Sequence, residues 1–154
     1  LRTRRQRQMC IRDRNELVKV AYILVNKGEK RTAERFIKSA VDNAKSDAEI
    51  SLISKFGKNI ERNEFSVIAA KQSERHGVFL FKTGYPVMET PNSSAEQSLV
   101  LGLIRQESRF CKNAVSPANA IGLMQILPST AKRTARKMKI RYSKRSLYNN
   151  AKYK

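Results

Sequence analysis

The helical spacing of apolar residues between positions 15 and 77 constrains the fold of this chain most strongly. Apolar side chains recur three or four positions apart, and short polar stretches such as residues 26–29 interrupt them. The pattern predicts four short helices with short connections. It indicates stacked helical hairpins, with an ordinary helical bundle as the alternative. The apolar positions are Leu17, Val20, Ala21, Leu24 and Val25; Ala33, Phe36, Ile37, Ala40, Val41 and Ala44; Ile50, Leu52, Ile53 and Phe56; and Phe65, Val67, Ile68 and Ala69.

The rest of the chain divides into three segments. Residues 1–14 hold six arginines and one aspartate, and positions 9–14 match the translation of a transposon end used in preparing sequencing libraries. We hypothesise that this segment is a sequencing artefact, with a disordered basic arm as the alternative. Residues 78–93 contain glycine and proline turn formers and are predicted to be a linker. Residues 94–154 form the segment that carries the chemistry.

Basic residues dominate the composition and point to an anionic partner. The formal net charge is +19, and residues 91–154 contain thirteen Lys or Arg and two acids. This excess fits either a solvated basic face or attraction to a polyanion such as peptidoglycan with its attached acidic polymers. Zinc-finger spacing and the aromatic–glycine strand signature are absent from the sequence, so no nucleic-acid partner is expected.

The sequence gives no sign of a transmembrane segment, a signal peptide or a metal site. No apolar run reaches about 18 residues, so no transmembrane segment is predicted, and the start of the chain lacks a signal-peptide pattern. Two cysteines, Cys10 and Cys111, cannot form a metal site by themselves, and no metal is expected. His76, the single histidine, lies at a predicted helix end, where a cationic histidine is a structural choice.

A buried helix is predicted from about residue 95 to residue 107. Ser93 with Glu96, and Ser94 with Gln97, form two overlapping capping boxes at its start. Its apolar residues nearly encircle it, which is typical of a helix that is buried on all sides. These residues are Leu99, Val100, Leu101, Leu103 and Ile104.

Glu107 ends this helix and is the candidate catalytic residue. It lies three residues after Ile104 and seven after Val100, so it continues the apolar stripe and is expected to face inward. Burial disfavours the ionised form of a carboxyl group, so an inward Glu107 would keep a proton near neutral pH, as a general acid must. The alternative is a solvated glutamate at a frayed helix end, paired with Arg105 or Arg109.

A compact loop is predicted to follow, because residues 110–122 show no helical or strand period and contain several turn formers. Gly122 would permit a close backbone approach. Gln125 would place an amide among apolar neighbours, and its partners could be the backbone or a substrate. Each of three residues also has a purely structural interpretation. Ser116 could start a turn, Met124 could fill the core, and Gln125 could bridge the loop.

A last helix is predicted from Ser129 to about Lys139. Pro128 suits its first turn, its apolar residues would face inward, and its Lys and Arg residues would face outward. Residues 141–154 are basic and tyrosine-rich and stop without a terminating signal. The chain is therefore expected to end within a domain.

Residues 101–131, LGLIRQESRFCKNAVSPANAIGLMQILPSTA, strongly resemble the soluble lytic murein transglycosylase family. Four motifs agree with the family at its spacing. The resemblance implies the first part of a lysozyme-like α domain, preceded by helix pairs like the superhelical portion of the larger members. The expected fold class is therefore mainly α. The motifs are Glu107-Ser108, Ala114-Val115-Ser116-Pro117, Gly122-Leu123-Met124-Gln125, and Pro128 before Thr130-Ala131.

The resemblance also implies a role for individual residues. Glu107 would be the catalytic acid, and Ser116 would form a hydrogen bond near the catalytic carboxyl group or its substrate. Met124 and Gln125 would line the glycan groove. The supporting residues would be Ser108 and Gly122.

The sequence departs from the family at three positions. Cys111 and Lys112 stand where the family usually has Asn or Asp followed by Pro, and Asn119 stands where Gly is usual. Asparagine tolerates left-handed backbone, so the turn at residue 119 is expected to survive. The family's later Asn-to-Gly helix motif and its Ala-Tyr-Asn segment have no counterpart here. About half of the catalytic domain is therefore expected to be missing, and the fragment alone is expected to be weak or inactive.

The resemblance implies cleavage of the β-1,4 bond between MurNAc and GlcNAc in peptidoglycan, in the periplasm or cell envelope and without a cofactor. Glu107 would act as acid and then as base, leaving 1,6-anhydro-MurNAc ends. A hydrolase ordinarily needs two flanking carboxylates, whereas Glu96 lies at the far end of the same helix. The alternatives are a lysozyme-like hydrolase and a non-catalytic basic module that binds cell-wall polymer or nucleic acid.

Overall fold

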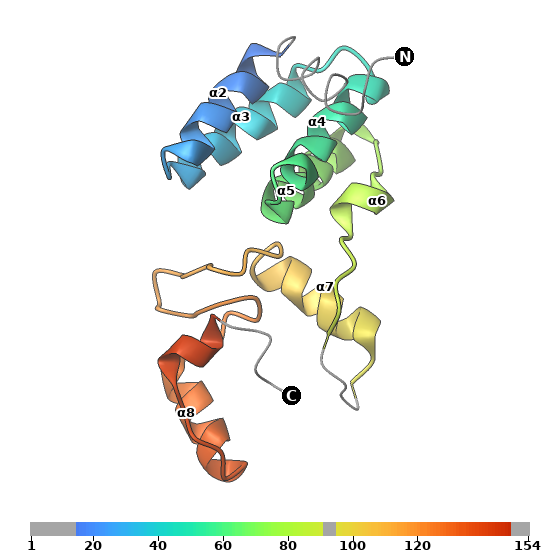
Figure 1. The fold of residues 1–154 in the computed structure, drawn as a ribbon. Helices are drawn as coiled ribbons and strands as arrows, with labels where there is room; N and C mark the ends of the chain where they lie inside the picture. Colours follow the sequence, from blue (N-terminus) through green and yellow to red (C-terminus); the bar gives the residue numbers. More distant parts are fainter. Residues whose placement is uncertain (1–14, 91–94, 149–154) are drawn as a thin grey trace. The chain divides into compact units, whose positions relative to one another are not determined.

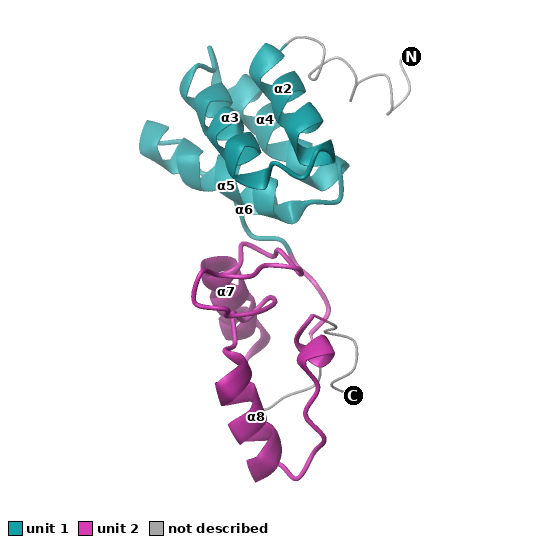
Figure 2. Cartoon of the chain, turned by 90° about the vertical axis from the view of Figure 1, so that its left-hand side faces the viewer, with its two compact units in different colours: residues 1–86 teal, residues 87–154 magenta. Residues whose placement is uncertain are grey.

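The computed structural model describes residues 15–90 and 95–148 and divides the chain into two compact units, residues 1–86 and 87–154 (Figure 2). The division falls within residues 78–93, where the sequence predicts a linker. Residues 1–14, which are hypothesised to be a sequencing artefact, lie outside the described residues. So do the two serines of the predicted capping boxes, Ser93 and Ser94.

The first unit is built from two helical hairpins (Figure 1). Helices α2 (Glu16–Asn26) and α3 (Lys30–Asp42) form the first hairpin, and α4 (Asp47–Asn59) and α5 (Asn63–Ser73) form the second. All four predicted helices are confirmed. They form because each carries apolar residues at helical spacing and a polar break ends each one.

Helix α5 lies at the centre of the first unit, in contact with α3, α4 and the short helix α6 (Phe81–Gly84). Nine of its eleven residues are buried. Because α6 packs against α5, residues 78–86 are part of this unit and not a free connector. The buried core consists of Val18, Ala21, Ala33, Ile37, Ala40, Val41, Ile50, Ile53, Phe56, Phe65, Ile68 and Ala69.

The second unit contains helix α7 (Gln97–Glu107), a non-helical loop, helix α8 (Pro128–Lys137) and the 3-10 turn η2 (Lys144–Leu147). Both predicted helices are confirmed to within two residues at each end. Pro128 occupies the first turn of α8, where its missing N–H is not needed. Across residues 15–90 and 95–148, no helix has the length and hydropathy required to span a membrane.

Helix α7 is less buried than its sequence predicts. Ile104 is its one buried residue, whereas Leu99 and Leu103 are 59% and 43% exposed. Burial on all sides requires neighbours on all sides, and α7 has no extensive contact with another helix in the described part of the chain. The expectation of a fully enclosed helix is therefore wrong for this structure.

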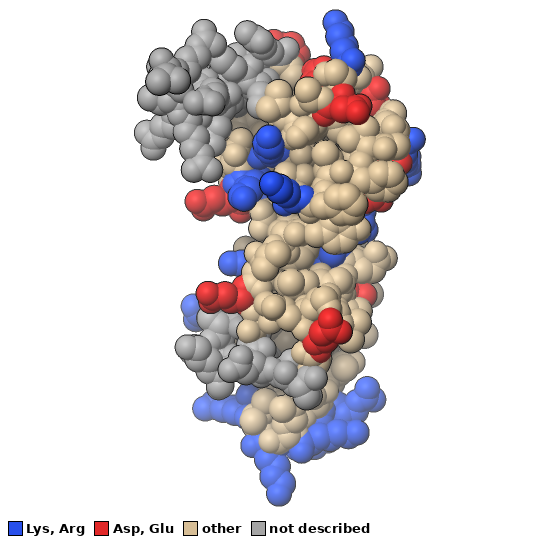
Figure 3. All heavy atoms as spheres, turned by 90° about the vertical axis from the view of Figure 1, so that its right-hand side faces the viewer, with Lys and Arg blue, Asp and Glu red and all other residues tan. Residues whose placement is uncertain are grey.

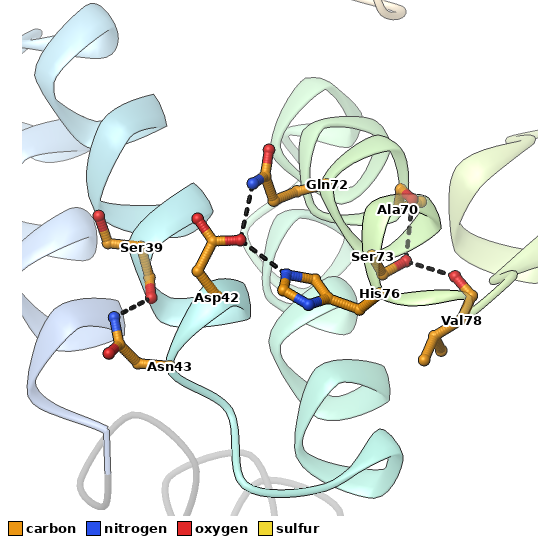
Figure 4. Close-up of polar contacts among 8 residues, drawn as sticks. All are labelled: Ser39, Asp42, Asn43, Ala70, Gln72, Ser73, His76 and Val78. Carbon is orange, nitrogen blue, oxygen red and sulfur yellow. Dashed lines mark hydrogen bonds and ion pairs between the residues drawn. The ribbon is translucent and has the colours of Figure 1, made fainter.

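A polar cluster joins the end of α3 to the end of α5 (Figure 4). Asp42 Oδ1 accepts hydrogen bonds from Gln72 Nε2 at 2.7 Å and from His76 Nε2 at 2.8 Å. Partial burial raises the pKa of Asp42, but these hydrogen bonds and the positive charges of His76 and Arg75 outweigh it. They hold the pKa below its ordinary value of 3.8. His76 thus has the structural role expected at a helix end.

Replacing Asp42 with Asn should make the free energy of unfolding less dependent on pH in acid. Because the pKa of Asp42 is lower in the folded chain, the cluster stabilises the fold above pH 3.8 and loses this contribution as pH falls through the folded value. The side chains of Asp42 and His76 are 43% and 40% exposed, so the effect should be about 0.5 kcal/mol. Urea denaturation across the acid range measures it. Equal acid sensitivity of the wild-type chain and Asp42→Asn would contradict the assignment.

Helices α4 and α5 approach each other closely at Gly57. A Cβ atom added there would lie 2.4 Å from the backbone nitrogen of Ser66 and 2.6 Å from the carbonyl oxygen of Arg62. Gly57→Ala should therefore destabilise the first unit by roughly 2–4 kcal/mol, because backbone atoms cannot rotate away. Lys55→Ala, at an exposed position of α4, is the control and should change little. Urea denaturation followed by circular dichroism would refute the close approach if both variants kept wild-type stability.

Candidate active site

The end of helix α7 places Glu107 directly before a sharp reversal of the chain. Ser108 is buried, and both its backbone N–H and its Oγ donate hydrogen bonds to the carbonyl oxygen of Ile104, at 3.1 and 3.2 Å. Arg109 and Phe110 follow with left-handed φ angles of 54° and 64°. The side chain of Phe110 is buried. The backbone on the C-terminal side of Glu107 is therefore fixed by hydrogen bonds and burial.

The side chain of Glu107 is exposed, so the expectation that it faces inward is wrong for this structure. Ser108, four residues after the buried Ile104, occupies the buried position one helical turn on. Glu107 consequently falls on the exposed side of the stripe. Within residues 95–148, no ion pair joins Glu107 to Arg105 or Arg109.

The loop after Glu107 contains a turn at residues 116–120. The N–H of Asn119 donates to the carbonyl oxygen of Ser116 at 2.9 Å, and Ser116 Oγ accepts a hydrogen bond from the N–H of Ala120 at 3.0 Å. Asn119 has a φ of 65°. This confirms that asparagine adopts the left-handed backbone where the resembled family usually has glycine. Ser116 therefore does act as a turn starter.

A second turn follows, closed by Ile121 and Ile126, which exchange two backbone hydrogen bonds of 3.1 Å. Gln125 Nε2 donates to the carbonyl oxygen of Gly122 at 2.9 Å and to that of Ala114 at 3.2 Å. The N–H of Gly122 also donates to Ala114, at 2.9 Å. Gln125 therefore acts as a loop bridge, since it ties the second turn to the strand-like segment before the first.

Gly122 brings this loop into contact with η2. A Cβ atom at residue 122 would lie 2.2 Å from the carbonyl oxygen of Leu147, and the φ of Gly122 is 78°. The predicted close backbone approach is thus confirmed. Sequence reasoning did not find Leu147 as its partner, because no local pattern links two residues so far apart in the chain.

Hydrogen bonds bring Ser116, Gly122 and Gln125 together in the folded loop, whereas Met124 lies at its surface. The side chain of Met124 is 37% exposed, so it is not a core filler here. The carbonyl oxygen of Ala114 accepts two of the hydrogen bonds that hold the loop. It was missed because a backbone acceptor leaves no signature in the sequence.

A hollow of about 540 Å³ lies between α8 and residues 140–147. None of the candidate site residues lines it, and no carboxylate does, so it is not suited to acid catalysis. In the ranges 15–90 and 95–148, no group of three or more His, Cys, Asp or Glu residues could hold a metal ion.

The mainly α fold resembles two solved lytic transglycosylases. An inactive variant of the lytic transglycosylase Slt from Pseudomonas aeruginosa matches 96% of this chain and 25% of its own, with a TM-score of 0.69 and 22% identity. The 70 kDa soluble lytic transglycosylase from Escherichia coli matches 84% of this chain and 22% of its own, with a TM-score of 0.62 and 25% identity. The chain therefore has a mainly α fold that resembles the lysozyme-like structures of lytic transglycosylases.

Sequence comparison relates the second half of the chain to lytic transglycosylases. The profile of the Transglycosylase SLT domain matches residues 85–152. Membrane-bound lytic murein transglycosylase C from Histophilus somni is 47% identical over 60 residues, which are 37% of this chain and 16% of the relative. The protein of the same name from Haemophilus influenzae is 52% identical over 44 residues, 29% of this chain and 12% of the relative. Residues 85–152 thus match the Transglycosylase SLT domain, and the matches to the two relatives span less than a fifth of those relatives' length.

The contact at Gly122 can be tested by substitution. Gly122→Ala combines a left-handed φ with a clash against a backbone carbonyl group, so it should destabilise the second unit by roughly 2–4 kcal/mol. Gly102→Ala, in α7 with open space around the added Cβ atom, is the matched control and should be neutral or slightly stabilising. Amide hydrogen exchange at Gly122 and Ile126 reports on this loop. Unchanged protection in Gly122→Ala would overturn the proposed constraint.

Proposed function

We propose that this chain carries part of the catalytic domain of a peptidoglycan lytic transglycosylase, with Glu107 as the catalytic residue. The observation that carries the proposal is the position of Glu107 at the end of α7, directly before the hydrogen-bonded loop 108–126. Glu107 is also the one acidic residue between positions 97 and 154. The match of residues 85–152 to the Transglycosylase SLT domain supports the assignment.

Within residues 95–148, the placement of the carboxylates fits a reaction that needs one carboxyl group. An inverting glycosidase holds its two carboxyl groups about 6.5–9.5 Å apart, and a retaining one holds them about 5–5.5 Å apart. Glu96, the nearest acid before Glu107, lies at the other end of α7, a helical rise of about 16 Å away. A reaction that uses Glu107 alone fits this arrangement.

The proposed reaction needs one carboxyl group and no water. The protonated Glu107 donates its proton to the glycosidic oxygen between MurNAc and GlcNAc, and the bond from that oxygen to C1 of MurNAc breaks. The Glu107 carboxylate then accepts the proton of the C6 hydroxyl group of the same MurNAc, whose oxygen bonds to C1. The products are a 1,6-anhydro-MurNAc end and a free GlcNAc hydroxyl group, and the carboxyl group is protonated again.

Ser116, Met124 and Gln125 are the proposed substrate-binding residues. Ser116 Oγ accepts a hydrogen bond inside the loop, but its hydrogen remains available to donate. Gln125 uses Nε2 within the loop, so Oε1 can accept a hydrogen bond from an acetamido N–H group. The exposed Met124 offers an apolar surface to a sugar ring. Ser108 and Gly122 would keep these groups in place through the backbone.

Because Glu107 is exposed in the free chain, the bound substrate would have to shield it from water. A glycan strand lying over Glu107 would exclude water and favour the protonated carboxyl group that the first step needs. The assignment of the chemistry to residues 94–154, the absence of a cofactor and a location in the cell envelope are parts of the same proposal. The two relatives, both named membrane-bound lytic murein transglycosylase C, support the location.

Replacing Glu107 with Gln should abolish peptidoglycan cleavage by the longest natural protein that contains this chain. The amide keeps the shape of the side chain but cannot donate the proton, so the rate should fall by about 10²–10⁴-fold or more. Turbidity loss of purified peptidoglycan measures the rate, and sedimentation with insoluble peptidoglycan measures binding, which should persist.

Glu96→Gln provides the matched control, because Glu96 is also exposed and flanks the same helix. Its activity should stay near that of the wild-type protein. Full activity of Glu107→Gln would contradict the assignment, and a wild-type protein that binds peptidoglycan without cleaving it would favour a non-catalytic wall-binding module.

A further inference from the structure

A second surface of the second unit lies at the C-terminal end of helix α8. We call residues 136–141, Arg136-Lys137-Met138-Lys139-Ile140-Arg141, the basic tip. Figures 1 and 2 both show this end of α8, with the turn that follows it, projecting away from α7. The basic tip is therefore a surface distinct from the surroundings of Glu107.

The cations of the basic tip have no acidic partners. All four are exposed, and residues 108–154 contain no Asp or Glu. No ion pair recorded for the described residues involves any of them. Figure 3 shows Lys and Arg side chains gathered at this end of the second unit without Asp or Glu among them. Such an uncompensated positive patch attracts an anionic surface.

Two large apolar side chains alternate with these cations. Met138 is 63% exposed and Ile140 is 46% exposed. A soluble polyanion offers no favourable contact to such side chains. The interface of a bilayer does, because it presents anionic headgroups beside acyl chains.

The turn that carries the basic tip has a fixed backbone. The N–H of Ile140 donates to the carbonyl oxygen of Ala135 at 3.0 Å, and Lys139 has a left-handed φ of 54°. Cations in the last turn of a helix interact favourably with the helix dipole and so stabilise the helix. This interaction accounts for the presence of Arg136 and Lys137. It does not account for the exposed Met138 and Ile140 beyond the helix.

We propose that the basic tip binds the surface of a bilayer that contains anionic phospholipids. Its Lys and Arg side chains contact headgroup phosphates, and Met138 and Ile140 enter the boundary between headgroups and acyl chains. Charge complementarity selects an anionic partner, and the apolar pair selects a bilayer over a soluble polymer. This contact is independent of the chemistry at Glu107.

Co-sedimentation of the 154-residue chain with vesicles tests the proposal. Binding is expected to vesicles of phosphatidylcholine mixed with phosphatidylglycerol and not to phosphatidylcholine alone. The triple variant Lys137→Gln, Lys139→Gln and Arg141→Gln should bind roughly a hundredfold more weakly. A triple variant of exposed cations in the first unit is the matched control and should bind like the wild-type chain. Its substitutions are Lys27→Gln, Lys30→Gln and Arg31→Gln.

Both triple variants keep the arginines of residues 1–14, so any binding by that segment is the same in both. An equal loss in the two would overturn the proposal, because it would indicate a general effect of net charge. The double variant Met138→Ser and Ile140→Ser separates a bilayer from a soluble polyanion. It should lose the part of binding that resists high salt. Unchanged vesicle binding by this variant, together with full competition by double-stranded DNA, would also overturn the proposal.

Discussion

The contact between Gly122 and the carbonyl oxygen of Leu147 is the constraint on which the second unit depends. It holds the loop after Glu107 against the chain that follows α8, at a distance that no side chain other than hydrogen permits. The hydrogen bonds from Gly122 and Gln125 to Ala114 extend this constraint toward the end of α7. The loop that follows Glu107 is therefore held by contacts between segments that are distant in sequence.

This construction has a consequence for the proposed chemistry. The described residues fix the backbone at Glu107 but do not bury its side chain, because Ser108 takes the buried place beside Ile104. A bound substrate cannot easily correct the placement of the acid, since a misplaced carboxyl group lies too far from the leaving oxygen to transfer its proton. Exclusion of water can come with the substrate, so an exposed glutamate on a fixed backbone is compatible with the proposed acid and base roles.

Local patterns predicted the parts of the fold that depend on local physics. The four helices of the first unit follow from apolar spacing, and the left-handed Asn119 follows from the tolerance of asparagine for that backbone. The inward face expected for Glu107 was wrong because burial depends on neighbours that a helical stripe does not specify. Leu147 could not be found because it is distant from Gly122 in the sequence. The carbonyl group of Ala114 could not be found because a backbone atom leaves no signature in the sequence.

The central claim is that Glu107 cleaves the glycan by itself, without a second carboxylate and without water. The most direct test is digestion of purified peptidoglycan in heavy-oxygen water by the longest natural protein that contains this chain, followed by mass spectrometry of the new ends. We expect MurNAc ends that are one water molecule lighter than reducing ends and carry no heavy oxygen. Reducing ends that have incorporated heavy oxygen at C1 would show that water attacks the bond and that the intramolecular reaction through Glu107 is wrong.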